Sequence, residues 1–84
     1  GIPERLERQL VAFIHEIRKL EIKKAPSISE TIDWARALIL LHAEGLDRDL
    51  TRKTLNTFLK FEEDIRAVDE KLFLLVDKAI KETA

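Results

Sequence analysis

Cysteine and tyrosine are absent from this chain, and glycine and proline occur only twice each among its 84 residues. The lack of cysteine excludes disulfides and thiolate metal sites. The shortage of glycine and proline, in a sequence that is 45% hydrophobic and 37% charged, favours helices over turn-rich β structure. We therefore predict an all-α fold.

The chain also lacks long apolar runs and an excess of charge of either sign. No apolar run approaches the roughly 18 residues of a membrane span, and charged residues occupy the N-terminal positions where a signal peptide would be apolar. Lysine and arginine number 15 against 16 acidic residues, so no global field would attract a polyanion. We expect no membrane and no nucleic-acid partner, and the lack of cysteine agrees best with a cytoplasmic location.

The length fits one small domain with one modest core. No repeat, low-complexity tract or long linker divides the sequence, so we predict a single helical domain over residues 1–84. We expect this domain to be a fragment of a larger protein.

Two helices are predicted in the first half, over residues 3–24 and 28–44. Pro3 suits the first turn of a helix, and Ala25 before Pro26 is pushed out of the α region. Ser27 and Glu30 fit a capping box at the start of the second helix. Gly45 is placed to end that helix in a left-handed conformation.

Apolar residues surround the axis of the second helix, and only a thin polar line interrupts them. This pattern predicts the central, most buried helix of the domain. The apolar residues are Ile32, Trp34, Ala35, Ala37, Leu38, Ile39, Leu40 and Leu41, and the polar line is Asp33, Arg36 and Glu44.

The second half predicts helices over residues 48–60 and 62–82, the first of them capped by Asp47 or Asp49. No glycine or proline interrupts residues 46–84, so these helices are either continuous or meet at a kink near residues 60–64. The expected architecture is a small bundle of three to four helices.

Residues with catalytic or metal-binding chemistry are few and scattered. His15 and His42 fall on different predicted helices, and N-capping accounts for Ser27 and Ser29. The acidic run over residues 62–64 is typical of a helix start or a solvated face, with weak cation binding as the alternative. No P-loop is present, so we expect the fragment itself to catalyse nothing and to hold no metal or cofactor.

Residues 24–38, which read Lys-Ala-Pro-Ser-Ile-Ser-Glu-Thr-Ile-Asp-Trp-Ala-Arg-Ala-Leu, resemble the C-terminal lid of MoxR-like AAA+ ATPases, especially the branch associated with von Willebrand factor A partners. Further similar pieces follow in the order that this family has, within residues 5–66. They are residues 11–20, Leu46-Asp47, Thr54-Leu55, Lys60 and Glu63-Asp64-Ile65.

The resemblance implies a helical lid that closes over ATP and Mg²⁺ held by an upstream AAA+ core. It also implies an ATP-hydrolysing parent protein, a homo-oligomeric ring expected to have six subunits, and chaperone-like remodelling of partner proteins, with a von Willebrand factor A domain protein as one candidate.

Such lids carry a Sensor 2 arginine, usually in a Ser-Pro-Arg motif, where this chain has Ser29-Glu30-Thr31. Arg36 is the nearest substitute as a residue that binds ATP, although it lies five residues beyond Thr31, about 140° around a helix. The alternative role for Arg36 is an ion pair with Asp33 on the same face.

Residues 72–76 are five consecutive apolar residues, more than one face of an amphipathic helix can bury. We predict that Phe73 or Leu74 docks on the ATPase core, on a neighbouring subunit or on a partner. Trp34 is interpreted as a core anchor, with a subunit interface as the alternative.

Two other functions compete with the lid. One is a free-standing helical interaction module that docks through the last helix. The other is a helix-turn-helix that contacts DNA phosphates through Arg48, Arg52 and Lys53, which the balance of charges disfavours.

Overall fold

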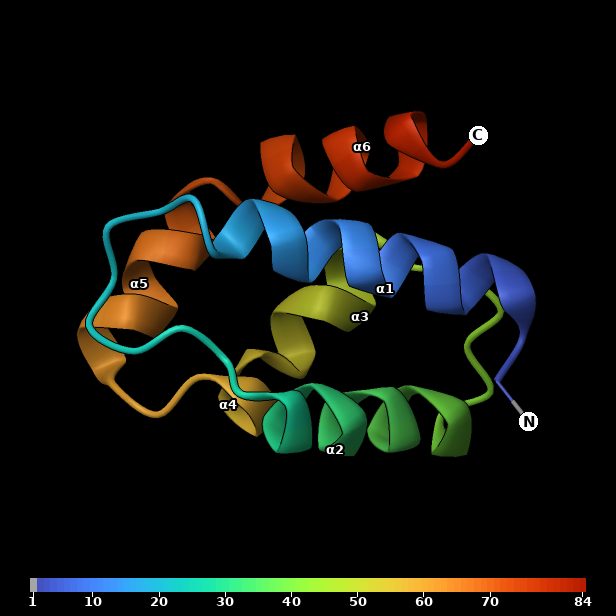
Figure 1. Cartoon of the computed structure of the whole chain (residues 1–84), viewed down its shortest axis with the longest axis horizontal. Helices are drawn as coiled ribbons and strands as arrows, with labels where there is room; N and C mark the ends of the chain where they lie inside the picture. The colour runs from blue at the N-terminus through green and yellow to red at the C-terminus, as the bar shows by residue number, and fades with distance from the viewer. Residues whose placement is uncertain (1) are drawn as a thin grey trace.

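The computed structural model describes residues 2–84 and is all-helical; Gly1, the first residue of the predicted domain, lies outside the described residues. Six helices follow one another with no strand among these residues, which confirms the predicted fold class with more and shorter helices than expected (Figure 1). They are α1 (Glu4–Ile17), α2 (Ile28–Leu40), α3 (Arg48–Lys53), α4 (Leu55–Phe58), α5 (Glu62–Glu70) and α6 (Leu72–Glu82).

The first helix, α1, is the centre of the domain. It runs between α6 and α2, with α3 behind it (Figure 1). Seven of its 14 residues are buried, against four of 13 in α2. The prediction that the second helix is the central one is therefore wrong.

One face of α2 remains in solvent although it is apolar. Trp34 and Leu38 are fully buried on the inner face, whereas Ile28 is 73% and Leu40 79% exposed. A chain of this length cannot supply enough helices to surround two apolar helices, and α1 takes the enclosed position.

Three aromatic rings form the middle of the core. The Trp34 ring lies 4.3 Å from that of Phe58 and 5.4 Å from that of Phe13, centroid to centroid. The indole Nε1 donates a 2.8 Å hydrogen bond to the Thr54 hydroxyl, which satisfies the one polar atom of the side chain. The prediction that Trp34 is a core anchor is confirmed.

The first helix ends at Ile17, seven residues before the predicted end. Beyond the turn at residues 18–20, the backbone N–H groups of Lys23 and Lys24 donate to the buried carboxylate of Asp64, at 2.8 and 3.0 Å. These N–H groups would have bonded within a longer helix. A contact from 40 residues away therefore overrides the local helical pattern.

The second helix ends before Gly45, and His42 takes the left-handed conformation predicted for that glycine, with φ of 61°. The His42 N–H donates to the Ile39 carbonyl and the Ala43 N–H to the Leu38 carbonyl, each at 3.0 Å. These two bonds are those of a Schellman motif. The expected place of His42 in the last turn of the helix is therefore wrong, since it lies just beyond the end.

Replacing His42 with glycine is expected to raise the free energy of unfolding by about 0.5–1 kcal/mol, because a side chain at positive φ is strained and this one is exposed. Chemical denaturation followed by circular dichroism measures the difference. A destabilised His42→Gly variant would contradict the motif.

Gly45 supplies the matched control, because it is needed for close approach rather than for its backbone angles. A Cβ atom there would lie 2.8 Å from Gln9 Oε1 and 3.2 Å from Arg5 Nε. Gln9 Oε1 is engaged by the Leu46 N–H at 2.8 Å, so Gly45→Ala is expected to weaken that bond and to destabilise the fold.

The second half of the chain is divided into four helices where two were predicted. Asp47 caps α3 through its carboxylate, as predicted, and the Thr54 hydroxyl donates to the Leu50 carbonyl where α3 gives way to α4. Of the two alternatives for the region near residues 60–64, continuity is excluded and a break is present, since residues 59–61 are not helical. A further break at Lys71 separates α5 from α6 and lets α6 lie along α1 (Figure 1).

An ion-pair network ties α6 to α1. The Lys78 ammonium lies 3.0 Å from one carboxylate oxygen of the buried Glu16, and the Lys19 ammonium lies 3.1 Å from the other. The hydrogen bond from Lys78, followed by that from Lys19, lowers the pKa of Glu16 against the opposing effect of burial.

Candidate functional site

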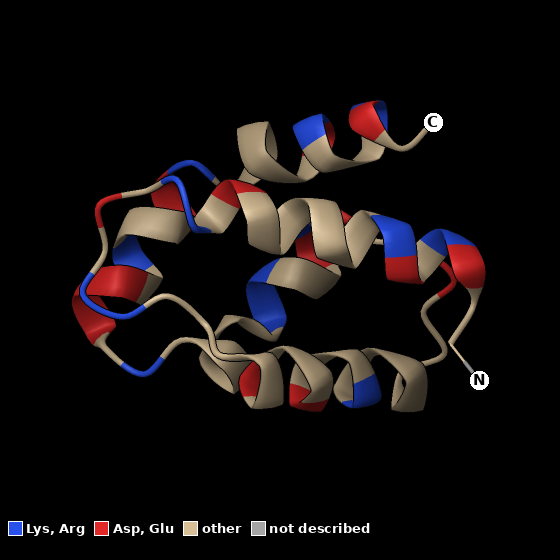
Figure 2. Ribbon diagram, in the orientation of Figure 1, with Lys and Arg blue, Asp and Glu red and all other residues tan. Residues whose placement is uncertain are grey.

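The exposed face of α2 carries several large apolar side chains, among them Ile28, Ile32 and Leu40. Figure 2 shows that the ribbon of α2 carries few charged positions. Ile28, Ile32, Arg36 and Leu40 recur every fourth residue and are all exposed, so they form one row along the solvent side. We call these four residues the α2 row. A single guanidinium thus lies within an aliphatic strip.

Arg36 has no carboxylate partner within 4.0 Å among residues 2–84, although Asp33 lies three residues earlier. The alternative of an Asp33–Arg36 ion pair is therefore not what the structure contains. The guanidinium of Arg36 is available to an anionic group outside the described residues.

The start of α2 is built as predicted. The Ser27 hydroxyl accepts from the Glu30 N–H at 3.1 Å, and the Glu30 carboxylate accepts from the Ser27 N–H at 2.9 Å, which completes the capping box. The Thr31 hydroxyl donates to the Ser27 carbonyl at 2.8 Å. Glu30 and Thr31 therefore organise the helix start, whereas the Ser29 side chain forms no such bond within residues 2–84.

Glu30 is also the anchor of two lysines from other segments. Its carboxylate lies 3.3 Å from the Lys24 ammonium and 3.6 Å from that of Lys60. The backbone hydrogen bond from Ser27, more than the lysines, lowers the pKa of Glu30 to about 2. The loop before α2 and the loop before α5 are thereby held to the same helix start.

Phe73 lies in a layer of charged residues between α3 and the last two helices. The Arg48 and Arg52 guanidinium groups lie over its ring, 4.4 and 5.0 Å from the centroid. Arg48 is bound by Asp77 and Arg52 by Asp69, at 2.6 and 2.8 Å. Asp69 lies on α5, Phe73 and Asp77 lie on α6, and both arginines lie on α3, so three helices supply the layer.

This layer changes the interpretation of the surplus apolar residues. Leu72, Leu75 and Val76 are buried, while Phe73 is 44% and Leu74 70% exposed, so the expectation that the run exceeds one face is confirmed. Phe73 already contacts two arginines of its own chain. Docking through Phe73 or Leu74 stays a prediction, with Leu74 the more accessible of the two.

The basic residues considered for DNA contacts are engaged with acids. Besides the Arg48 and Arg52 pairs, the Lys53 ammonium lies 3.5 Å from the Asp49 carboxylate. The hydrogen bond from Arg48 lowers the pKa of Asp77, so the pair is charged at neutral pH. This end of α3 presents neutralised charge rather than a phosphate-binding patch.

The acidic run at the start of α5 has a structural role that sequence reasoning missed. Asp64 is 2% exposed and accepts the two loop N–H groups of Lys23 and Lys24, while Glu63 forms a 2.6 Å ion pair with the Lys23 ammonium. No signal in the sequence links residues 23 and 64. No group of three potential ligands to a metal ion gathers among residues 2–84.

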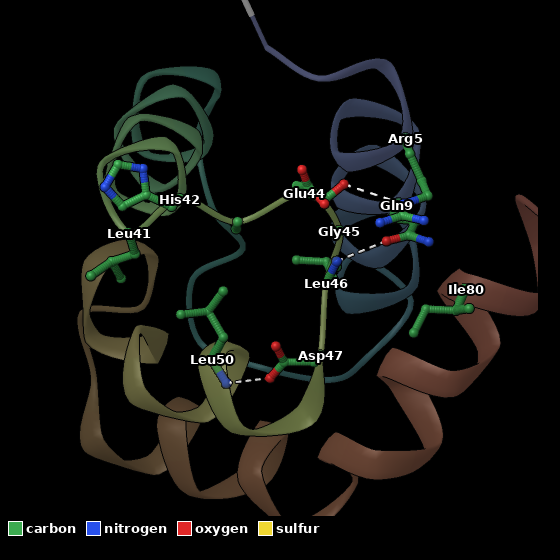
Figure 3. Close-up of a pocket in the computed structure, with 11 residues that line it drawn as sticks. Arg5, Gln9, Leu41, His42, Glu44, Gly45, Leu46, Asp47, Leu50 and Ile80 are labelled. Atoms are coloured by element: carbon green, nitrogen blue, oxygen red, sulfur yellow. Dashed lines mark hydrogen bonds between the residues drawn. The ribbon is translucent and has the colours of Figure 1, made fainter.

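A polar hollow of about 610 Å³ lies beside the α2–α3 connection (Figure 3). Its polar side chains form hydrogen bonds with backbone groups. Arg5 Nε donates to the Glu44 carbonyl at 3.3 Å, Gln9 accepts from the Leu46 N–H, and Asp47 accepts from the Leu50 N–H. The hollow contains no paired nucleophile and base. These polar side chains stabilise the connection between α2 and α3. His42 lines the hollow, whereas His15 on α1 does not.

None of the helices in residues 2–84 is long and apolar enough to cross a membrane. No family model matches the chain, and comparison with curated proteins and with solved structures also finds no match.

Proposed function

We propose that this chain is the C-terminal helical lid of a MoxR-like AAA+ ATPase. The proposal is supported by the similarity of residues 24–38 to such lids, which covers the capping box and most of α2. The similar pieces at residues 11–20 and 46–47 lie on either side of α2 along the chain, at the end of α1 and just before α3. An all-helical domain of this size suits a lid.

The observation that carries the proposal is the unpaired Arg36 within the α2 row. A lid must contact a second domain, and an exposed aliphatic strip provides the apolar part of such a contact. A guanidinium within that strip provides a cation for a phosphate at the boundary between the domains. Arg36 is therefore the residue through which the lid would sense nucleotide, despite its offset from the usual Sensor 2 position.

In the proposed mechanism, an upstream AAA+ core binds ATP and Mg²⁺ and carries out hydrolysis. The lid moves as one rigid body on its hinge and passes the nucleotide state to the neighbouring subunits of a homo-oligomeric ring, with six subunits as the expected number. The work done is chaperone-like remodelling of a partner, for which a von Willebrand factor A domain protein is one candidate.

The full-length protein tests this proposal through Arg36→Ala. We expect at least a tenfold loss of ATP turnover, because a positioned guanidinium stabilises charge on the transferring phosphoryl group. Arg66→Ala is the matched control, since Arg66 is an exposed arginine of α5 without an ion pair among residues 2–84. This substitution is expected to leave ATP turnover unchanged. Normal turnover and nucleotide affinity in Arg36→Ala would contradict the role of Arg36.

A free-standing helical interaction module is the second candidate, and the exposure of Leu74 on α6 favours it. The coding sequence upstream of Gly1 separates the two functions. A P-loop and an Asp-Glu pair following a strand support the lid, whereas a start codon directly before Ile2 supports the module.

A further inference from the structure

A small apolar groove lies between α1 and the first turns of α2, and it shares Ile28 and Ile32, but not Arg36, with the α2 row. Four aliphatic side chains line it, Val11, Ile14, Ile28 and Ile32, beside two basic ones, His15 and Arg18. Val11 is 59% exposed and Ile32 46%, so large aliphatic surface surrounds a hollow on both helices.

The size of the groove selects its occupant. Its volume is about 200 Å³. Sites for small molecules and cofactors usually span roughly 300–1,000 Å³, so this groove is too small for most of them. It suits a branched aliphatic side chain presented by another polypeptide, as in recognition of an amphipathic helix by a groove.

The charge around the groove is of one sign. Both titratable residues in its lining, His15 and Arg18, are basic, and neither forms an ion pair with a carboxylate of residues 2–84. The neighbouring Lys19 is, in contrast, neutralised by Glu16. Arg18 Nη2 donates to the Pro26 carbonyl at 3.3 Å, which holds the guanidinium at the groove and leaves its other N–H groups for a ligand.

The acidic residues nearest the groove in sequence do not line it, and Glu16 is bound by Lys19 and Lys78 and Glu30 by Lys24 and Lys60. Glu7, about one turn before Val11, lines a separate hollow beside the end of α6. Asp33 follows Ile32 but points about 100° further around α2 and does not line the groove. A partner with carboxylates beside its apolar residues therefore meets complementary charge.

We propose that this groove binds an acidic amphipathic segment of a partner protein. A branched apolar side chain of that segment inserts between Val11, Ile28 and Ile32, and an adjacent carboxylate binds Arg18. The assignment goes beyond the lid function, because it uses no nucleotide and not Arg36; since it shares Ile28 and Ile32 with the α2 row, a segment bound in the groove and a second domain packed on these two residues would compete.

Titration of the ¹⁵N-labelled chain with two synthetic helical peptides tests the proposal. One peptide carries leucines at i and i+4 flanked by glutamates, and the other has every glutamate replaced by lysine. We expect amide shifts confined to residues around Val11, Arg18 and Ile32, and binding of the lysine peptide at least tenfold weaker. Equal binding of both peptides, or shifts centred on Leu74, would overturn the proposal.

Charge reversal at two exposed arginines distinguishes the groove from general attraction. Arg18→Glu is expected to lower the affinity for the acidic peptide at least tenfold. Arg36→Glu, outside the groove on the same surface, is expected to change that affinity less than twofold. Arg18→Gln keeps a donor for the Pro26 carbonyl and gives an intermediate loss. Equal losses for Arg18→Glu and Arg36→Glu contradict the site, as does a dimer in sedimentation that Ile32→Asp dissociates, since a second copy would then fill the groove.

Discussion

Replacing Trp34 with alanine is expected to lower the free energy of unfolding by about 3–5 kcal/mol. The side chain is fully buried, and its ring packs against those of Phe13 and Phe58, which also contact each other. The substitution removes the largest side chain of the core and leaves a cavity where α1, α2 and α4 meet. Since small domains have total stabilities of about 5–15 kcal/mol, a large part of the stability depends on this one residue.

Trp34→Phe separates packing from the hydrogen bond to Thr54. Phenylalanine retains an aromatic ring against Phe58 but loses the 2.8 Å bond from the indole, so we expect a loss of about 1–2 kcal/mol. The Thr54 hydroxyl keeps its bond to the Leu50 carbonyl in both variants. Urea denaturation followed by circular dichroism measures both, and a loss below about 1 kcal/mol for Trp34→Ala would contradict the central position of this ring.

Local signals in the sequence predicted the parts of the fold that local interactions determine. The capping box of Ser27 and Glu30 and the cap at Asp47 were predicted because each involves residues at most three apart. Leu6, Leu10, Phe13 and Ile17, which are all buried on α1, recur at steps of three and four, the spacing typical of one buried helix face.

Contacts between distant residues account for the differences. The end of α1 depends on Asp64, and the break at Thr54 lies where its hydroxyl meets the Trp34 indole, 20 residues away. The left-handed residue fell at His42 rather than at Gly45, where two hydrogen bonds close the helix on the carbonyls of Ile39 and of the fully buried Leu38. Gly45, three residues further on, instead allows Gln9 to approach the backbone closely, and no local pattern of the sequence indicates that contact.

The candidate site could be predicted only in part. The apolar character of α2 was evident, but which side faces solvent depends on which helix takes the centre, and the spacing of apolar residues alone does not determine that. Val11 likewise lies off the buried stripe of α1. Its meeting with Ile28 and Ile32 in a groove required the packing of two helices separated by a loop.

Glu30 makes the stability of the domain depend on pH under acidic conditions. Its pKa falls from the ordinary 4.5 to about 2 in the folded chain, chiefly through the backbone hydrogen bond from Ser27. A group with a lowered folded pKa contributes stability above its unfolded value, and that contribution disappears as pH falls through the folded value. We therefore expect a loss of at most about 3 kcal/mol between pH 4.5 and 2, because a tenfold change in proton affinity corresponds to about 1.36 kcal/mol.

Glu30→Gln assigns this loss, because glutamine preserves the capping box but not the charge. At pH 7 the variant is expected to be less stable than the wild-type chain by the same amount, and the two curves of stability against pH should converge near pH 2. The stability of the Glu30→Gln variant should still fall somewhat with falling pH because of Glu16, whose pKa is lowered by Lys78 and Lys19. Glu70→Gln, at an exposed acid without an ion pair among residues 2–84, is the control for the removal of one negative charge. If the stability of Glu30→Gln ran parallel to the wild-type curve, the carboxylate would not be the charged anchor of α2, because its titration would then leave folding unaffected.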